Sequence, residues 1–276
     1  MKAAGPWAWW NQYGSVPLGK CLARAGDVRG VIVKAGWWHE FDEFRAVGPV
    51  AIERYVYPDN VPNEIVMLCA GLDRGAEFAV INAEAEWEGF TTDEPMMQLI
   101  NGIRARNPGV ELYASIDSRG NRTRTPCLRA LIRECTGIMP EVYPKAFRPS
   151  MPPGAVPAAF VDSIAAKDFQ GKPLLPTLQT YDGIGAIAVT EQIAQCERPG
   201  YQGWQAYTIA HATDAEWAAF IANIPKEDDM ADEATKRRWA AAAAIFSQIH
   251  DYANIGLPAP IELVRAARFL IKDYPA

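Results

Sequence analysis

The sequence predicts an α/β protein built on a (β/α)8 TIM barrel, with a short helical hairpin at its C-terminal end. Eight short apolar segments rich in strand-forming residues recur along the chain, and each is followed by a segment with helical spacing of its apolar residues. The length of 276 residues also fits, because one barrel commonly takes about 250 residues. An open doubly wound sheet is less favoured, because the turn NQYGSVPLG after the first segment lacks the G-x-G-x-x-G pattern.

The candidate strands are short apolar segments rich in strand-forming residues. In chain order the strands are expected at 5–14, 29–36, 52–59, 77–86, 110–117, 137–144, 173–181 and 201–208.

Most of the intervening segments end on a glycine, which adopts the left-handed conformation that terminates a helix at little cost. The helices are expected at 18–26, 40–48, 62–75, 93–109, 125–137, 156–171, 186–200 and 213–224, the last with Thr213 or Asp214 as its N-cap.

The composition changes after residue 224, and we place the domain boundary there. Residues 1–224 form the predicted barrel domain, and residues 225–276 form a helical C-terminal extension. Its two expected helices, at 239–256 and 259–273, are separated by a Gly-Leu-Pro turn. This hairpin could pack on the barrel, mediate self-association or bind a cell-wall component.

Charge and composition exclude several classes of partner. A formal net charge of -6 and a pI near 5.2 argue against nucleic acid, because a phosphate-binding protein usually carries a basic face. No signal peptide and no membrane span are predicted, so the chain is expected to be made in the cytoplasm. The five cysteines form no C-x-x-C pair and the three histidines have no ligand spacing, so we expect buried thiols, no metal and no cofactor.

The fourth predicted strand ends in acidic residues, in the stretch EFAVINAEAEWEGF. Side chains alternate along a barrel strand, so Asn82, Glu84 and Glu86 are expected to share one side at its carboxyl end, where barrel enzymes build active sites. Clustered carboxyl groups repel, so one keeps its proton to higher pH, as acid/base cleavage of a glycosidic bond requires. The alternative is that these acids are solvated, or pair with Lys34 and Arg54.

The ends of the other strands carry polar and aromatic residues suited to sugars. Rings stack on the C–H faces of pyranoses, while amides and acids bind hydroxyl groups. Besides Asn82, the expected substrate-binding residues are Trp9, Asn11, Tyr57, Tyr143, Gln179, Tyr181, Gln205 and Tyr207, and Asp117 ends the fifth strand as a further carboxylate.

Four short motifs make the chain resemble the lysozyme-like barrels of glycoside hydrolase family 25 and related phage or bacterial wall-lytic barrels. The motifs are GVIVKAG at 30–36, YVYP at 55–58, INAEAEWEG at 81–89 and GWQAYT at 203–208. The resemblance covers residues 1–224 and implies hydrolysis of peptidoglycan, with Glu84 as the proton donor.

Two residues depart from the family pattern. Asn82 stands where the family has Asp in its Asp-x-Glu motif, and Asn11 is the nearest match to an aspartate of the first strand. Glu86 or Asp117 would then supply the second carboxylate.

Three functions follow from these observations. The leading one is a glycosidase that cleaves bacterial cell-wall polysaccharide, an endolysin-like phage product released at lysis or carried in a virion. The alternative is a catalytically inactive glycan-binding or structural barrel of a phage particle or surface assembly. A phosphate-handling barrel is the third, since YDGIGAIAV at 181–189 puts glycines after the seventh strand.

Overall fold

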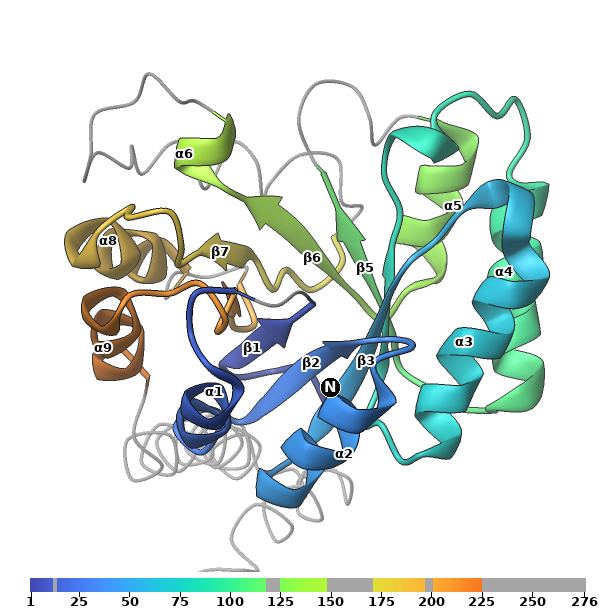
Figure 1. The fold of residues 1–276 in the computed structure, drawn as a ribbon. Helices are drawn as coiled ribbons and strands as arrows, with labels where there is room; N and C mark the ends of the chain where they lie inside the picture. Colours follow the sequence, from blue (N-terminus) through green and yellow to red (C-terminus); the bar gives the residue numbers. More distant parts are fainter. Residues whose placement is uncertain (12–13, 118–124, 148–170, 197–200, 225–276) are drawn as a thin grey trace, which may run out of the picture. The chain divides into compact units, whose positions relative to one another are not determined.

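The described part of the chain is a closed barrel of eight parallel strands surrounded by helices (Figure 1). The computed structural model describes residues 1–11, 14–117, 125–147, 171–196 and 201–224. The strands pair in sequence order and β8 closes on β1, with Gln205 opposite Trp7. The predicted (β/α)8 barrel is therefore confirmed. The strands are β1 (Trp7–Trp10), β2 (Gly30–Lys34), β3 (Val50–Tyr55), β4 (Ala79–Asn82), β5 (Leu112–Ile116), β6 (Gly137–Val142), β7 (Thr177–Gln179) and β8 (Gln205–Tyr207).

Helices follow the strands, and each α-helix of the described residues overlaps a predicted helix, except the short one at Pro144–Phe147, where none is expected. They are α1 (Leu18–Ala25), α2 (Trp38–Val47), α3 (Val61–Asp73), α4 (Glu94–Arg106), α5 (Pro126–Glu134), α6 (Pro144–Phe147), α8 (Ala186–Cys196) and α9 (Asp214–Ala222), with two 3-10 turns, η1 (Pro58–Asn60) and η2 (Ala85–Trp87). The helix expected at 156–171, apart from its last glycine, and the extension at 225–276 lie outside the described residues, so both stay predictions.

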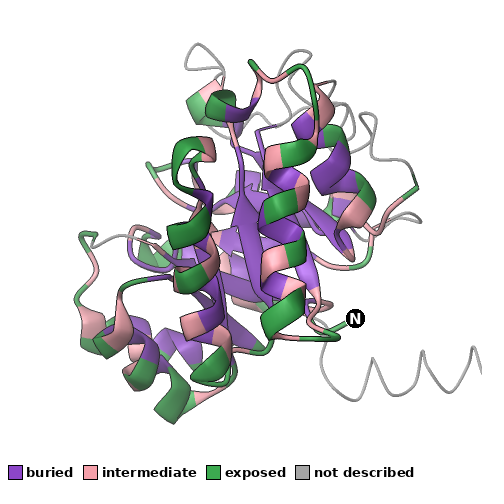
Figure 2. Cartoon of the chain, turned by 90° about the vertical axis from the view of Figure 1, so that its right-hand side faces the viewer, coloured by how far each residue is buried: buried purple, intermediate pink, exposed green. Residues whose placement is uncertain are grey.

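Alternation along the strands divides the buried side chains into two cores. One set, such as Val31, Val33 and Ile52, packs outward against the helices. The other fills the barrel lumen, and we call its lower part the lumen floor; it consists of Ala3, Trp7, Trp9, Ile32, Ala51, Phe78, Val80, Tyr113, Met139 and Leu175. Figure 2 shows the buried strands enclosed by helices whose outer faces are exposed.

The start of β2 makes room for the largest side chains of the lumen floor. Gly30 is paired with Trp7, and a Cβ on Gly30 would lie 2.5 Å from Cζ3 of the Trp7 indole. Only glycine therefore leaves the space that this ring occupies. Trp7 in turn packs edge-on against Phe78, with ring centroids 4.7 Å apart.

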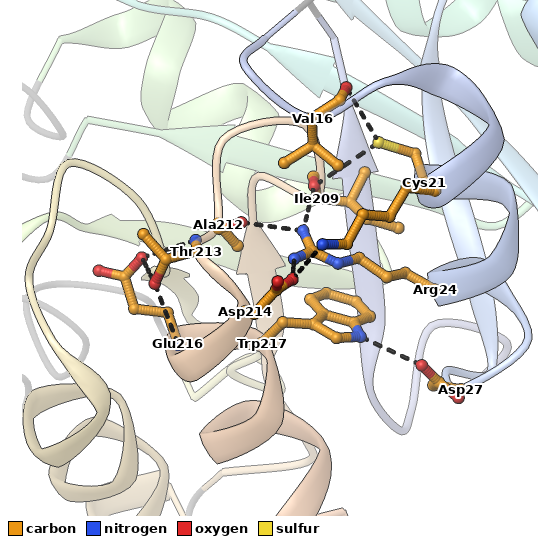
Figure 3. Close-up of polar contacts among 11 residues, drawn as sticks. Val16, Cys21, Arg24, Asp27, Ile209, Ala212, Thr213, Asp214, Glu216 and Trp217 are labelled. Carbon is orange, nitrogen blue, oxygen red and sulfur yellow. Dashed lines mark hydrogen bonds and ion pairs between the residues drawn. The ribbon is translucent and has the colours of Figure 1, made fainter.

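A buried arginine joins the first helix to the last part of the barrel (Figure 3). Arg24 on α1 is 5% exposed and donates hydrogen bonds to the carbonyl oxygens of Ile209 (3.1 Å) and Ala212 (2.9 Å). Its guanidinium also pairs with Asp214 at 2.8 Å and lies over the Trp217 ring, 5.4 Å from the centroid. These contacts hold α1 against the β8–α9 connection, where the barrel closes.

Several local predictions are confirmed in the described residues. Thr213 is the N-cap of α9, in a reciprocal capping box with Glu216. All five cysteines are buried free thiols. No helix within the described ranges is long and apolar enough to cross a membrane.

Candidate active site at the carboxyl end of the strands

A cavity of about 320 Å³ opens at the carboxyl end of the strands, above the lumen floor. Its residues come from five strands, β2, β3, β4, β6 and β8, and from the segments that follow β1, β4, β6 and β7. We call it the mouth cavity; it is lined by Asn11, Lys34, Glu53, Tyr55, Asn82, Glu84, Glu141, Tyr143, Tyr181 and Tyr207. This is the face on which barrel enzymes carry their active sites.

The same alternation that fills the lumen places these side chains. On β3, Ala51 lies in the lumen floor, and Glu53 and Tyr55 follow at steps of two residues. On β6, Met139 lies in the floor, and Glu141 and Tyr143 follow in the same way. Each strand thus changes from apolar to polar as it reaches the mouth.

Two buried glutamates of the cavity hold their protons near neutral pH. Burial raises the pKa of Glu53 to about 7, although the nearby charge of Lys34 and a hydrogen bond from Asn82 act in the opposite direction. Burial also raises the pKa of Glu141 to about 8, and the charges of Glu84 and Asp117 raise it further. Ser115 Oγ donates to Glu141 Oε1 at 3.4 Å. Both groups therefore favour the protonated form to a higher pH than an exposed carboxyl group does.

Three tyrosines on β6, β7 and β8, or directly after them, form an aromatic side of the cavity. The ring of Tyr143 lies 5.1 Å from that of Tyr207 and 6.1 Å from that of Tyr181, and Tyr181 and Tyr207 are 5.7 Å apart, all between centroids. β7 is opposite β3 in an eight-stranded barrel, so these rings face the carboxyl groups of β3 and β4. Such a surface can stack on the C–H face of a sugar ring.

Two amides, those of Asn11 and Asn82, add acceptors to the cavity. Asn11 Nδ2 donates to the hydroxyl of Tyr207 at 2.7 Å. Among the described residues, no hydrogen-bond partner reaches Asn11 Oδ1, Asn82 Oδ1 or Glu53 Oε2, all of which are buried atoms of lining residues. A buried acceptor without a partner is costly, so these atoms mark where a ligand would donate hydrogen bonds.

The acidic stretch after β4 lies partly where the sequence predicts. Strand β4 ends at Asn82, four residues earlier than expected, and the chain turns into η2 at Ala85. Asn82 and Glu84 line the cavity, but Glu86 does not. The prediction that Glu86 shares their side is wrong, because strand alternation stops before it.

Glu86 is exposed and accepts a hydrogen bond from the hydroxyl of Tyr55 at 2.6 Å. The next residue, Trp87, donates from Nε1 to the carbonyl oxygen of Val56 at 2.9 Å. Both bonds tie the turn that follows Glu84 to the end of β3. Arg54, one of the two cations expected as a partner of these acids, forms an ion pair with Glu64 on α3 at 2.5 Å.

Asp117 does not line the cavity. It is 1% exposed, directly after β5, and its charge acts on Glu141. Asp117 is thus close to the carboxyl group that the structure does place in the cavity.

Four of the expected substrate-binding residues lie outside the lining. Trp9 belongs to the lumen floor, and Gln205 is fully buried beside it, with Nε2 donating to the carbonyl oxygen of Ala3 at 3.4 Å. Gln179 is also fully buried and accepts a hydrogen bond from the backbone of Lys145. Tyr57 is 44% exposed beside Tyr55, at the rim.

Sequence reasoning missed four lining residues: Lys34, Glu53, Tyr55 and Glu141. A signal was available, because each lies at an even step from a predicted or buried lumen residue on its strand. Glu141 lies two residues before Tyr143, and Tyr55 two before Tyr57. The sequence pattern places these residues inside predicted strands, where a buried core position is expected. In the structure, the last positions of a strand that face the lumen already line the mouth cavity.

A second, shallower hollow of about 340 Å³ is lined by the five consecutive residues Gly36 to Glu40 at the start of α2. No group of three or more His, Cys, Asp or Glu within the described part of the chain is arranged to hold a metal ion.

Comparison with known proteins supports the fold. No protein-family model matches the chain, and no curated protein sequence matches it. A GH2 beta-galacturonidase from Eisenbergiella tayi, solved with galacturonate, is similar with a TM-score of 0.58 and 11% identity over 79% of this chain and 50% of that one. This chain therefore spans half the length of the galacturonidase.

A GH18 chitinase from Flavobacterium johnsoniae is similar with a TM-score of 0.57 and 10% identity, over 81% of this chain and 94% of the chitinase. A dihydrodipicolinate synthetase from Pseudomonas aeruginosa aligns at a TM-score of 0.48 and 12% identity, over 98% of this chain and 80% of that one. The similarity to the galacturonidase and the chitinase supports the barrel fold of this chain.

Proposed function

We propose that this protein is a glycoside hydrolase that cleaves a polysaccharide by carboxylate acid/base catalysis in the mouth cavity. Glu141 is the general acid in this proposal, and Glu84 is the ionised carboxylate that stabilises positive charge or attacks the anomeric carbon. This pair replaces the expected pairing of Glu84 with Glu86 or Asp117.

The observation that carries the proposal is that a buried carboxyl group with a raised pKa, Glu141, and a half-buried carboxyl group, Glu84, line one cavity. Glu141 is buried, and the charge of Glu84 helps to raise its pKa to about 8. Glu141 therefore keeps a proton at neutral pH, which a glycosidic oxygen needs in order to leave. Glu84 lies at the end of β4 and is only half-buried, so its charge is better solvated.

The rest of the lining suits a sugar. Tyr143, Tyr181 and Tyr207 offer ring faces, while Asn11 and Asn82 offer acceptors to hydroxyl groups. We propose bacterial cell-wall peptidoglycan as the first polymer to test, on the four motifs of the lysozyme-like resemblance alone. A phage product released at lysis or carried in a virion is the corresponding biological setting.

The experiment is release of reducing ends from purified sacculi and from soluble β-1,4-linked amino-sugar oligomers, between pH 4 and 9. We expect Glu141→Gln and Glu84→Gln each to lower kcat by about 10²- to 10⁴-fold, the usual contribution of an acid or base. Glu191→Gln, an exposed change on α8, is the matched control and should leave kcat unchanged. Equal activity of all four proteins would refute the roles given to Glu84 and Glu141.

The pH profile gives an independent check. The acid must be protonated to work, so activity should fall as the pH rises through about 8, where Glu141 loses its proton. A profile that stays flat to pH 9 would contradict the assignment.

A glycan-binding barrel without turnover is the second candidate. It is favoured by Asn11 and Asn82, which line the cavity where the resembling family carries aspartates. In that case the wild-type protein binds glycan but releases no reducing ends, and Glu84→Gln leaves binding unchanged.

A further inference from the structure

We infer that the mouth cavity recognises a primary ammonium group on its substrate, so that the sugar unit it binds is an amino sugar with a free amine. This inference deepens the proposed function and rests on it for the sugar. The recognition of the amine rests on the cavity alone.

The residues that line the cavity include more carboxyl groups than cations. Glu53, Glu84 and Glu141 line it, with Lys34 as the one cation among its lining residues, and Asp117 is buried close to Glu141. Lys34 acts on Glu53 but does not restore its ordinary acidity, since the pKa of Glu53 stays raised to about 7. Glu53 and Glu141 therefore favour their protonated forms, and a positive charge brought close to them would favour their ionised forms.

The unpartnered buried atoms of the lining residues are all acceptors. Glu53 is 2% exposed and Asn82 is 8% exposed, and in the described residues nothing donates to Glu53 Oε2 or Asn82 Oδ1. Asn11 Oδ1 is a third acceptor of this kind. The amide nitrogen of Asn11 is already engaged with Tyr207, and that of Asn82 with Glu53, so both amides present oxygen to the cavity.

An ammonium group matches this arrangement better than other sugar substituents. It has three N–H donors and a positive charge, whereas an N-acetyl group has one N–H and no charge, and a hydroxyl group donates once. The carboxylate of Glu53 would bind it by a charge-assisted hydrogen bond. The rings of Tyr143, Tyr181 and Tyr207 on the other side would carry the pyranose and also favour a cation over their faces.

The test is isothermal titration of the full-length protein at pH 6.5 with tetrasaccharides of glucosamine and of N-acetylglucosamine. We expect the glucosamine tetramer to bind at least tenfold more tightly. Its charge should also lower the pKa of Glu53 and Glu141, so binding should release protons, measured as a difference in heat between two buffers of unlike ionisation enthalpy.

Glu53→Gln removes the charge but keeps the size of the side chain, and should reduce the preference for the free amine to less than threefold. Affinity for the N-acetylated tetramer should stay within twofold. Glu191→Gln, the exposed control, should keep the full preference. An equal preference in Glu53→Gln and wild type, or no preference in wild type, would overturn the inference.

A third ligand, n-hexylammonium, separates an amino sugar from amines in general. If it binds as tightly as the glucosamine tetramer, the sugar part of the inference fails. The outcomes also separate this inference from the hydrolase proposal. Tight binding of the glucosamine tetramer without turnover refutes hydrolysis alone, while turnover of N-acetylated oligomers without an amine preference refutes amine recognition alone.

Discussion

The lumen floor and the mouth cavity are built by the same strands, and they differ in almost every chemical respect. On β3, Ala51 belongs to the floor, and Glu53, one alternation step further, belongs to the mouth. The floor is filled by rings in direct contact, while the mouth holds about 320 Å³ of space and several carboxyl groups. Packed apolar side chains therefore occupy one end of the barrel lumen, and polar and ionisable side chains occupy the other.

The division has a physical cause. Rings of the floor pack edge-on, with Phe78 lying 4.7 Å from Trp7 and 4.9 Å from Tyr113 between centroids, and each buried ring adds to the free energy of unfolding. In the mouth, burying a carboxyl group costs free energy, which appears as the raised pKa of Glu53 and Glu141. The favourable packing of the lumen floor thus offsets the free energy that the buried carboxyl groups of the mouth cost.

The largest effect is expected in the floor. Phe78→Ala leaves a cavity between Trp7 and Tyr113, so the free energy of unfolding should fall by about 3–5 kcal/mol. Denaturation in urea measures it. Val66→Ala, on the exposed face of α3, is the control and should change stability by no more than about 0.5 kcal/mol. A small loss in Phe78→Ala would mean that the floor is not the stable end of the barrel.

The next effect is in the mouth, where a substitution should raise the free energy of unfolding at high pH. A carboxyl group with a raised pKa in the folded state binds its proton more tightly there than in the unfolded chain, so wild-type stability should fall as the pH rises from about 4.5 to about 8. Glu141→Gln removes the part of this decrease in the free energy of unfolding that Glu141 causes. At pH 9 it should be more stable than wild type by on the order of 2–4 kcal/mol, and at pH 4 nearly equal.

Urea denaturation of both proteins at pH 4 and pH 9 checks this prediction. If the variant and the wild type lose the same stability between the two pH values, Glu141 is not a destabilising group of the mouth. Glu191→Gln, exposed on α8, should follow the wild type at both pH values.

The smallest effect concerns the contact between Tyr55 and Glu86 at the rim. Tyr55→Phe loses one hydrogen bond to a partly exposed carboxylate, so stability should fall by only about 0.5–1.5 kcal/mol. Because that bond holds the turn after Glu84, kcat should fall more than stability alone explains. Glu86→Gln, which keeps an acceptor, should lose less of both; an equal kcat in Tyr55→Phe and wild type would exclude a role in positioning Glu84.

The sequence was sufficient for the order of strands and helices and for the carboxyl-end location of Glu84, because both follow from local periodicity. It was not sufficient for Glu86, since a 3-10 turn begins at Ala85 and ends the alternation. It also placed Trp9 and Gln205 at the mouth, whereas both are buried lower in the lumen. Depth along a barrel depends on how the strands are staggered around it, and no single strand reveals this.

Glu53 and Glu141 were missed for a related reason. Glu141 lies between Pro140 and Val142, and Glu53 lies between Ile52 and Arg54, so the sequence context of each resembles that of a buried ion-pair residue. Only the closure of the barrel brings β3 and β6 to face a common space with β4.

The packing of Ala3 into the lumen floor determines whether a molecule can pass through the barrel. Ala3 is fully buried there, its backbone nitrogen donates to the Tyr113 hydroxyl at 3.3 Å, and its carbonyl accepts from Gln205. Within the described residues, the lower end of the lumen is therefore closed, and the cavity opens at the carboxyl end of the strands. For the polysaccharide of the proposed function, this means that the polymer lies across the mouth with one unit in the cavity, and that products leave by the opening through which the substrate entered.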